Sequence, residues 1–236
     1  MCGRYATFGP VSVSREAREV LDELELDIIS EINQREPQYN IAPTDRALIV
    51  VHGDGQYHVK LYQWGLVPSW SKDSKAGRKL RNARADTVAT MPSYRAAFRK
   101  RRCLVPASGY FEWTGVEGQK QPWFIHDPEG QLMMFAGLWE GWRASPEADW
   151  LHTFTILTGE PGKVSGDLHD REPVILPPDL WEVWVEGTAD EAGAVLAAVP
   201  EAALAYHPVS KAMNSPSFKS VAAVEAIPMG TPPGSE

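Results

Sequence analysis

Apolar residues recur at every third or fourth position near the start of the chain, which is the spacing of one face of an α-helix. We therefore predict a helix over residues 14–27, packed on a core, with Ser12 or Ser14 as its N-cap. The members of this apolar stripe are Ala17, Val20, Leu21, Leu24 and Ile28.

Short runs rich in β-branched and aromatic residues dominate the middle of the chain and predict strands. Residues 47–51 and 57–61 flank a turn-rich segment, and residues 123–126 and 131–135 flank Pro128-Glu129-Gly130, so we predict two hairpins. Further strands are predicted at 103–106, 110–113, 151–157 and 173–176, and further helices at 93–101, 179–185 and 189–199.

Hairpins rather than regular β-α-β alternation favour an α+β fold with a mainly antiparallel sheet or a partly open barrel and peripheral helices. The chain shows no internal repeat and no dividing linker, so we expect one domain over residues 1–227. The Pro- and Gly-rich residues 228–236 predict a flexible C-terminal tail.

Composition narrows the function classes. The 236 residues are 43% hydrophobic and 23% charged, typical of a globular protein, and no stretch is apolar enough for a membrane span or a secretory signal. We expect a cytoplasmic protein without a membrane partner. The two cysteines, Cys2 and Cys103, have neither the spacing of a zinc site nor that of a disulfide framework, so we expect no metal and no cofactor.

The net charge of −8 argues against a nonspecific nucleic-acid coat, because phosphate neutralisation needs Lys and Arg. Residues 71–102 nevertheless hold eleven basic side chains against two acidic ones. Such a chain can present one positive surface to a bounded strand of DNA while the rest of it repels polyanions. A solvated basic helix face remains the alternative.

Cys2 is the sharpest chemical feature. Removal of Met1 would leave a thiol and an α-amine on one residue, and that amine titrates near ~8, so part of it is neutral at physiological pH. With an aldehyde the amine forms a Schiff base, and the thiol then closes on the imine carbon to give a thiazolidine. The alternative is that Cys2 merely follows the initiator. The hypothesis requires a cysteine that is open to solvent.

Four other polar side chains can support such chemistry. Asn82 can hold a sugar hydroxyl or an amine, and Arg84, two residues on, can bind phosphate. Glu112 lies between Phe111 and Trp113, where desolvation can raise its pKa toward neutrality. His169 titrates in the range that proton transfer needs. Each of them, taken alone, also fits a structural role.

Aromatic residues offer faces for unpaired bases. Trp64 and Trp70 can stack on them, and Pro43 can act as a rigid wedge. Core packing is the alternative for any single Trp.

Taken together and in order, nine segments across nearly the whole chain resemble the SRAP family, the SOS response-associated peptidase-like proteins that crosslink to abasic sites in single-stranded DNA. The segments are Met1-Cys2-Gly3-Arg4-Tyr5, Tyr39-Asn40-Ile41-Ala42-Pro43, Trp64-Gly65-Leu66-Val67-Pro68, Asn82-Ala83-Arg84-Ala85-Asp86-Thr87, Arg102-Cys103-Leu104-Val105-Pro106, Gly109-Tyr110-Phe111-Glu112-Trp113, Phe135-Ala136-Gly137-Leu138-Trp139, His169-Asp170-Arg171 and His207-Pro208-Val209-Ser210.

The resemblance implies a bifurcated β-sheet or barrel core surrounded by helices, and a role for each site residue. Cys2 is the crosslinking nucleophile, Asn82 orients the amine and the opened sugar, Glu112 transfers protons for ring opening and crosslink reversal, and His169 bonds to the deoxyribose. The implied phosphate and strand contacts are Arg4, Asn40, Arg84 and Arg171, with Trp70 and Pro43 against bases.

The implied activity is covalent capture of abasic sites through a Cys2 thiazolidine, with weak AP lyase activity and N-terminal self-processing as a peptidase. The implied partner is single-stranded DNA with abasic sites, also at junctions with duplex, bound by a monomer that joins the nucleoid during DNA damage.

Three positions depart from the family pattern. Asp86 stands where Glu is common, which shortens that arm. Glu172 follows Arg171 where Met or Arg is usual, which places a negative charge beside a phosphate contact. Residues 157–162 lack the Thr-Thr pair and the downstream Asn that are often found there.

Two other classes compete with this interpretation. An N-terminal-nucleophile hydrolase such as a class II glutamine amidotransferase also begins Met-Cys-Gly, but it typically uses an Asn-Gly pair, and no Asn here precedes Gly. A non-catalytic single-strand binding module would use only the basic segment and the tryptophans. Survival of the complex in SDS separates the second class from covalent capture.

Overall fold

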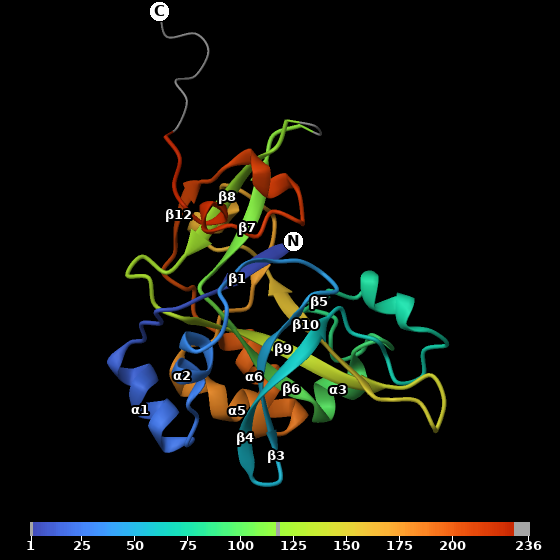
Figure 1. Cartoon of the computed structure of the whole chain (residues 1–236). Coiled ribbons are helices and arrows are strands. Elements are labelled where there is room, and N and C mark those ends of the chain that lie inside the picture. The colour runs from blue at the N-terminus through green and yellow to red at the C-terminus, as the bar shows by residue number, and fades with distance from the viewer. Residues whose placement is uncertain (1, 117–118, 229–236) are drawn as a thin grey trace, which may run out of the picture.

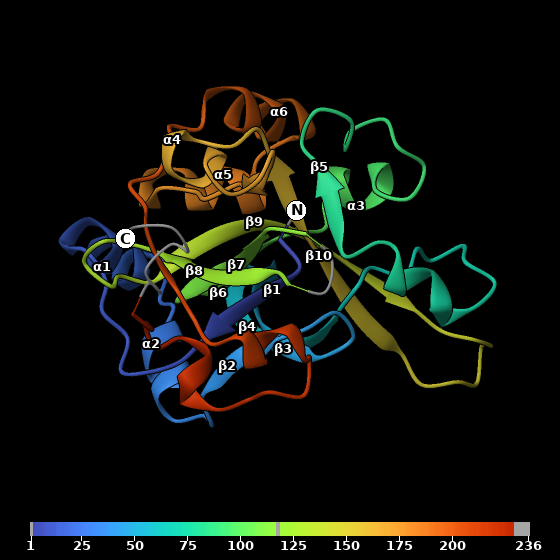
Figure 2. The ribbon, with the colours of Figure 1, turned by 90° about the horizontal axis from the view of Figure 1, so that it is seen from above.

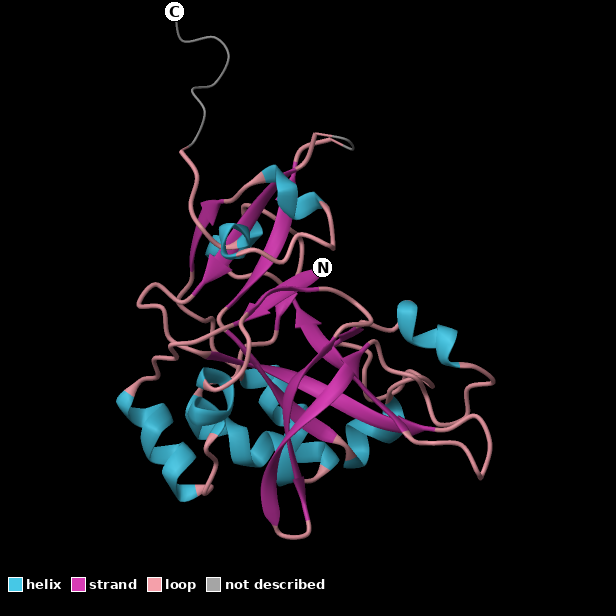
Figure 3. Cartoon of the chain, viewed as in Figure 1, coloured by secondary structure: helices cyan, strands magenta, loops and turns pink. Residues whose placement is uncertain are grey.

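Five strands pair in a closed ring and form a small barrel (Figures 1 and 3). Around the ring, β3 pairs with β4, β4 with β10, β10 with β9, β9 with β6, and β6 with β3; only the β4–β10 pair is parallel. The computed structural model describes residues 2–116 and 119–228. The barrel strands are β3 (Arg46–Gly53), β4 (Gln56–Trp64), β6 (Arg102–Ala107), β9 (Met133–Trp142) and β10 (Leu151–Gly159).

Alternation along the strands divides the apolar side chains between two cores. In β3, Ala47 and Ile49 belong to the cluster that fills the barrel, whereas Leu48 and Val50 face the helices outside it. This follows from the two-residue period of a strand, which points successive side chains to opposite faces. Both faces of β3 are therefore buried, and its sequence reads as a continuous apolar run.

The helices cover the outside of the barrel (Figure 1). Ser14 caps the first helix as predicted, because its side chain accepts a hydrogen bond from the backbone N–H of Ala17. That helix ends at Glu23 rather than at residue 27, since Glu25 adopts a left-handed conformation (φ 49°), and a short second helix follows. The helices are α1 (Arg15–Glu23), α2 (Ile28–Asn33), α3 (Arg95–Lys100), α4 (Lys163–Gly166), α5 (Trp181–Glu186) and α6 (Ala189–Ala198).

Shorter elements complete the described chain. A strand is predicted at residues 173–176, but the observed strand β11 (Glu172–Pro173), which pairs with β10, includes only the first of these residues. Short 3₁₀ helices lie at Ser74–Arg78, Pro178–Leu180, Lys211–Asn214 and Val221–Ala223. The predictions at 93–101, 179–185 and 189–199 are confirmed by α3, α5 and α6.

A second sheet of five antiparallel strands lies across one end of the barrel (Figures 1 and 2). Its order is β12 (Ala205–Pro208), β8 (Gln121–His126), β7 (Gly109–Thr114), β1 (Arg4–Thr7) and β2 (Gln38–Ile41). The three-residue strand β5 (Asn82–Arg84) extends the other sheet by pairing in parallel with β10. The N-terminal strand therefore has a partner strand on each side, and Cys2, two residues before it, lies in the cluster that fills the barrel.

The predicted α+β class, with a mainly antiparallel barrel and peripheral helices, is confirmed, but one predicted hairpin is wrong. Residues 123–126 lie in β8 and residues 133–135 lie in β9, yet these strands belong to different sheets. β8 pairs with β7 and β12, and the turn at Gly130 (φ 70°) passes the chain from one sheet to the other. The Pro128-Glu129-Gly130 sequence correctly predicts a turn, but a turn sequence does not determine which strand pairs with β8.

Among the described residues, no helix is both long and apolar enough to cross a membrane. Of the predicted C-terminal tail, only Pro228 lies within the described residues.

A helix interior offers a test of local stability. Gly193 lies in the middle of α6, and a Cβ added there meets no atom within 4 Å. We expect Gly193→Ala to stabilise the protein by about 0.8–1.0 kcal/mol, because Ala loses less backbone entropy in a helix. For a chain of this size the midpoint of thermal unfolding should rise by roughly 2–4 °C in calorimetry. A lower midpoint would show that the helix needs the freedom of glycine at this position.

Candidate functional site

Cys2 lies two residues ahead of β1, in the cluster that fills the barrel. Its side chain is 0% exposed and belongs to the same cluster as Tyr5, Trp64 and Tyr110, and its Sγ donates a hydrogen bond to the carbonyl oxygen of Arg4 at 3.5 Å. Burial raises the pKa of the Cys2 thiol far above its ordinary value, and the nearby Glu112 carboxylate raises it further. The thiol is therefore neutral at physiological pH.

The predicted solvent exposure of Cys2 is wrong for this form of the chain, in which Met1 precedes it. The cause is the placement of β1, which pairs with β2 on one side and β7 on the other and so draws the preceding residue under the second sheet. Any reaction at Cys2 requires this cover to open.

The structure brings Asn82 and Cys2 together as predicted. The Nδ2 group of Asn82 donates a hydrogen bond to the carbonyl oxygen of Cys2 at 2.7 Å. Asn82 is held by β5, where it pairs with Ile156, and by the hydroxyl of Tyr94, which donates to its backbone carbonyl at 2.9 Å. Sequence analysis missed Tyr94, because an aromatic residue ahead of a helix carries no signal for such a contact.

Glu112 reaches the same site from β7. Its side chain is 2% exposed, and burial raises the pKa of its carboxyl group to about 7, with the charge of Asp170 acting in the same direction. At neutral pH this group is therefore divided between acid and base, as a proton-transfer residue needs. The predicted desolvation of Glu112 is confirmed.

His169 lies in the turn after α4, next to Asp170. Its Nδ1 is 2.7 Å from Oδ1 of Asp170 and 3.1 Å from the backbone nitrogen of Arg171. Burial lowers the pKa of His169 despite the opposing effect of Asp170, so the ring is neutral at physiological pH. Asp170 and the Arg171 backbone both contact Nδ1 and so fix the orientation of the ring.

Arg4 and Asn40 form a pair that links the N-terminal strands to the C-terminal segment. Nη1 of Arg4 donates to Oδ1 of Asn40 at 3.0 Å and to the carbonyl oxygen of Met213 at 3.3 Å, and its guanidinium lies 5.7 Å from the ring centre of Trp113. Asn40 is 1% exposed and donates to the carbonyl oxygen of Phe218. Asn40 thus holds Arg4 in place, and its own contact with DNA stays a prediction.

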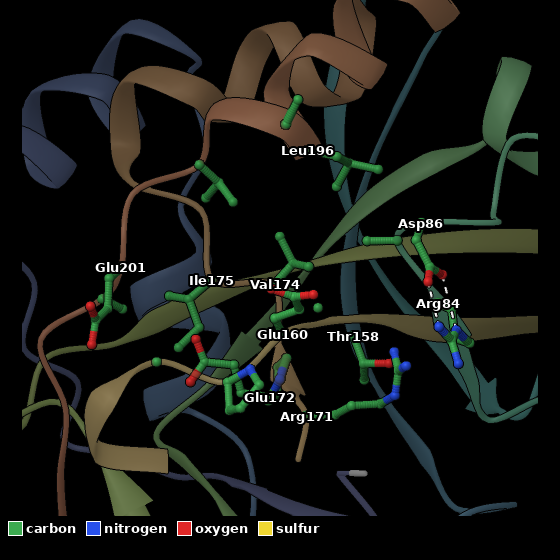
Figure 4. A pocket seen from close by; sticks show the side chains of 18 of the residues that line it. Arg84, Asp86, Thr158, Glu160, Arg171, Glu172, Val174, Ile175, Leu196 and Glu201 are labelled. Carbon is green, nitrogen blue, oxygen red and sulfur yellow. Dashed lines mark hydrogen bonds and ion pairs between the residues drawn. The ribbon is translucent and has the colours of Figure 1, made fainter. Parts of the chain in front are cut away.

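Arg84 and Arg171 both line one side of a cavity of about 590 Å³ (Figure 4). Arg84 is paired with Asp86 through two hydrogen bonds, one of them 3.0 Å long from Nε. This pairing lowers the pKa of Asp86 to about 2. The Asp86 that departs from the family pattern is therefore long enough to orient Arg84.

The two predicted base contacts lie outside this cavity. Trp70 is 65% exposed in the loop after β4, and Pro43 is partly exposed beside Thr44, which has a positive φ of 81°. Trp64 is different. It is 0% exposed and its Nε1 donates to the carbonyl oxygen of Arg81 at 2.7 Å, so its predicted stacking role is wrong and it is a core residue.

Two of the eleven basic side chains of segment 71–102 do not contribute to a positive surface, whereas eight others are exposed. Arg102 is 4% exposed and donates to backbone carbonyls at the end of α5 and α3, and Arg101 pairs with Glu140 at 2.7 Å. These arginines hold helices against the barrel and are not available to DNA. Sequence analysis could not separate them from Arg84, because burial depends on the tertiary fold.

Two further residues, to which the sequence assigned no role of their own, lie beside the site. Ser165 is fully buried and its hydroxyl donates to the carboxylate of Glu172. Burial raises the pKa of Tyr110, and the charges of Glu172, Cys2 and Glu112 raise it further. In the described part of the chain, no group of three or more His, Cys, Asp or Glu residues is arranged to hold a metal ion.

Comparisons with known proteins identify the family of this chain. Residues 1–216 match the model of the family described as SOS response associated peptidase (SRAP). The chain is 32% identical over 230 residues to the abasic site processing protein YoqW of Bacillus subtilis (strain 168), covering 96% of this chain and 100% of YoqW. It is 31% identical to the abasic site processing protein YedK of Escherichia coli (strain K12), covering 91% of this chain and 95% of YedK.

Solved structures share the fold. A protein from Bacteroides thetaiotaomicron superimposes with a TM-score of 0.73 at 22% identity, covering 96% of this chain and 100% of the other. A phage-related protein from Bordetella bronchiseptica superimposes with a TM-score of 0.65 at 31% identity, covering 89% of this chain and 95% of the other. From its sequence match and its barrel fold, this chain belongs to the SRAP family.

Proposed function

We propose that this protein captures abasic sites in single-stranded DNA as a covalent adduct with Cys2, after Met1 has been removed. The observation that carries the proposal is the buried Glu112, whose pKa is about 7, beside a residue 2 that Asn82 holds by its carbonyl oxygen at 2.7 Å. Relatives named abasic site processing proteins support the choice of substrate.

The first step uses the α-amine, because part of it is neutral at physiological pH and a neutral amine attacks a carbonyl carbon. The open-chain form of an abasic deoxyribose exposes an aldehyde at C1′. The α-amine of Cys2 attacks this carbon, and the resulting carbinolamine loses water to give an imine. Asn82 fixes the backbone of Cys2, and His169 forms a hydrogen bond with the sugar.

The second step closes the ring. The Cys2 sulfur adds to the imine carbon, the thiol proton passes to the Glu112 carboxylate, and the imine nitrogen takes up a proton. Aldehyde and cysteine thus give a thiazolidine and one water. Ring closure is favoured because both nucleophiles are tethered to one residue. The product has no imine left to promote β-elimination and strand cleavage.

We propose that polar and aromatic side chains hold the DNA strand. Arg4, Arg84 and Arg171 serve as phosphate contacts, and Asn40 positions Arg4. Trp70 and Pro43 are the exposed groups that meet bases. We propose weak AP lyase activity, which arises when the imine undergoes β-elimination before the ring closes. We also propose that any peptidase activity is limited to processing of the protein's own N-terminus.

Intact mass tests the proposal in one measurement. We expect purified protein to lack Met1, and incubation with an oligonucleotide carrying one abasic site to add the mass of the oligonucleotide less one water. The adduct should survive SDS. A mass that stays unchanged would contradict covalent capture and favour a non-catalytic binding module.

A chain that keeps residues ahead of Cys2 is the matched control. We expect a short N-terminal extension to abolish the adduct, because the α-amine is then an amide and the thiol stays buried. Thiol labelling under native conditions checks the second point. Labelling of Cys2 should be slow in the extended chain and fast in the chain without Met1, and equal rates would show that Met1 removal does not open the site.

A further inference from the structure

The cavity of about 590 Å³ lies between the β5–β10–β11 edge and α6 (Figure 4). Its size falls in the range of small-ligand pockets. None of Cys2, Asn82, Glu112 and His169 lines it. The mechanism proposed above therefore leaves this cavity without a role.

The cavity is nevertheless continuous with the reactive site along two segments. On β5, Asn82 and Arg84 are two residues apart and point to the same face of the strand; Asn82 contacts Cys2, whereas Arg84 lines the cavity. The turn after α4 repeats this pattern, because His169 belongs to the reactive site and Arg171 lines the cavity. A group just beyond a sugar held at Cys2 therefore meets the two arginines first.

The lining is polarised from one end to the other. Arg84 and Arg171 lie at one end, Glu201 lies at the other, and the carboxylates of Glu160 and Glu172 lie between them (Figure 4). Apolar side chains of Val174, Ile175 and Leu196 form part of the walls. With Asp86 included, four carboxylates face two arginines, so the interior repels a phosphate and favours a neutral group that donates hydrogen bonds.

Glu201 is held in place by the start of α4, directly after the loop that departs from the family pattern. Its Oε1 accepts the backbone N–H of Lys163 at 2.6 Å, and the side chain lines the cavity. This approach depends on Gly162, because a Cβ there would lie 2.8 Å from Oε1 of Glu201. The glycine that stands in the altered loop thus makes room for a carboxylate at the end of the cavity.

We propose that this cavity binds the base of a nucleotide adjacent to the abasic site and prefers bases with an exocyclic amine. The inference rests on the function proposed above. Arg84 and Arg171 hold the linking phosphate at the mouth, the base lies against Leu196 and Val174, and its amino group donates to Glu201. Adenine, cytosine and guanine carry such an amine and thymine does not, and carboxylates accept hydrogen bonds from amino groups of bases elsewhere in DNA recognition.

The experiment compares rates of adduct formation on oligonucleotides that differ only in one base beside the abasic site. Two series vary the 5′ and the 3′ neighbour among the four bases, unsubstituted purine as the amine-free match to adenine, and a baseless spacer. We expect one series to show about tenfold faster capture with adenine than with purine, in line with the discrimination that one good base contact gives. Equilibrium binding to a tetrahydrofuran analogue, which cannot form an imine, should show the same order.

Three variants locate the effect in the cavity. Gly193 of α6 lines the cavity, and a side chain there enters open space, so Gly193→Phe should fill it and reduce every rate in the sensitive series to that of the baseless spacer. Gly193→Ala should keep the full preference. Glu201→Gln retains an oxygen for the Lys163 N–H but replaces the carboxylate, and it should make adenine and purine react alike.

The outcomes separate this inference from the proposed function. If wild type and Gly193→Phe both form adducts at the same rate for every neighbouring base, the proposed base pocket is wrong, but capture by Cys2 is not affected. Wild type that forms no adduct with any oligonucleotide overturns the proposed function itself. A base preference that persists in Gly193→Phe places the base elsewhere and also overturns the pocket.

Discussion

Replacing Cys2 with Ala is expected to reduce the SDS-stable DNA adduct by at least about 100-fold and to increase strand cleavage at the abasic site. The variant keeps an α-amine at residue 2 once Met1 is removed, so the imine still forms. Without sulfur the imine cannot close to a thiazolidine, and β-elimination becomes its main fate. A denaturing gel with oligonucleotide labelled at one end separates adduct, intact strand and cleaved strand in one lane.

Cys103→Ala is the matched control, since Cys103 is also fully buried in the barrel but is remote from the chain terminus in sequence. It should leave the adduct yield unchanged wherever the protein folds. Borohydride trapping gives a second readout, because it reduces an imine to a stable amine and should restore an adduct to Cys2→Ala. If Cys2→Ala forms the adduct in undiminished yield without borohydride, the stable adduct is not a thiazolidine.

Much of the reactive site follows from the sequence because its chemistry depends on local features. Cys2 is recognisable from its position behind Met1, and Glu112 from the aromatic residues on either side of it. The contact of Asn82 with Cys2, by contrast, spans 80 positions of sequence and arises only because β5 joins the edge of β10. Ordered motifs indicated that these residues belong together, but only the fold shows how.

The errors have one physical origin, which is that burial is decided by tertiary packing. Trp64, Arg102 and Cys2 are each suited to an exposed role by residue type, yet the barrel or its helices cover all three. The false hairpin between residues 123–126 and 131–135 has a related cause, since a turn motif fixes the chain direction locally while the sheet partner depends on distant strands. The cavity beside α6 left no pattern in the sequence, because the residues that line it come from separate segments of the chain.

Glu112 links reactivity to stability. A carboxyl group of ordinary pKa near 4.5 is held at about 7 chiefly by burial. Below about pH 4.5 it is protonated in both the folded and the unfolded protein. As the pH rises from there to about 7, the unfolded state loses this proton first, so the free energy of unfolding falls. Above about pH 7 the penalty stays constant at on the order of 3 kcal/mol, from 1.36 kcal/mol per pKa unit.

Glu112→Gln is therefore expected to unfold at a higher temperature than wild type at pH 8, by roughly 5–10 °C, and at nearly the same temperature at pH 4.5. Gln keeps the size and hydrogen-bonding capacity of the side chain and removes the ionisation. The same variant should form adducts about 100-fold more slowly and lose the pH dependence near 7, because no group remains to take the thiol proton. Thermal unfolding at the two pH values, with exposed Glu36→Gln as the control, measures the first effect. Equal unfolding temperatures of wild type and Glu112→Gln at pH 8 would show that burial of the ionised Glu112 does not destabilise the protein. An unchanged dependence of the adduct-forming rate on pH would show that Glu112 transfers no proton in the reaction.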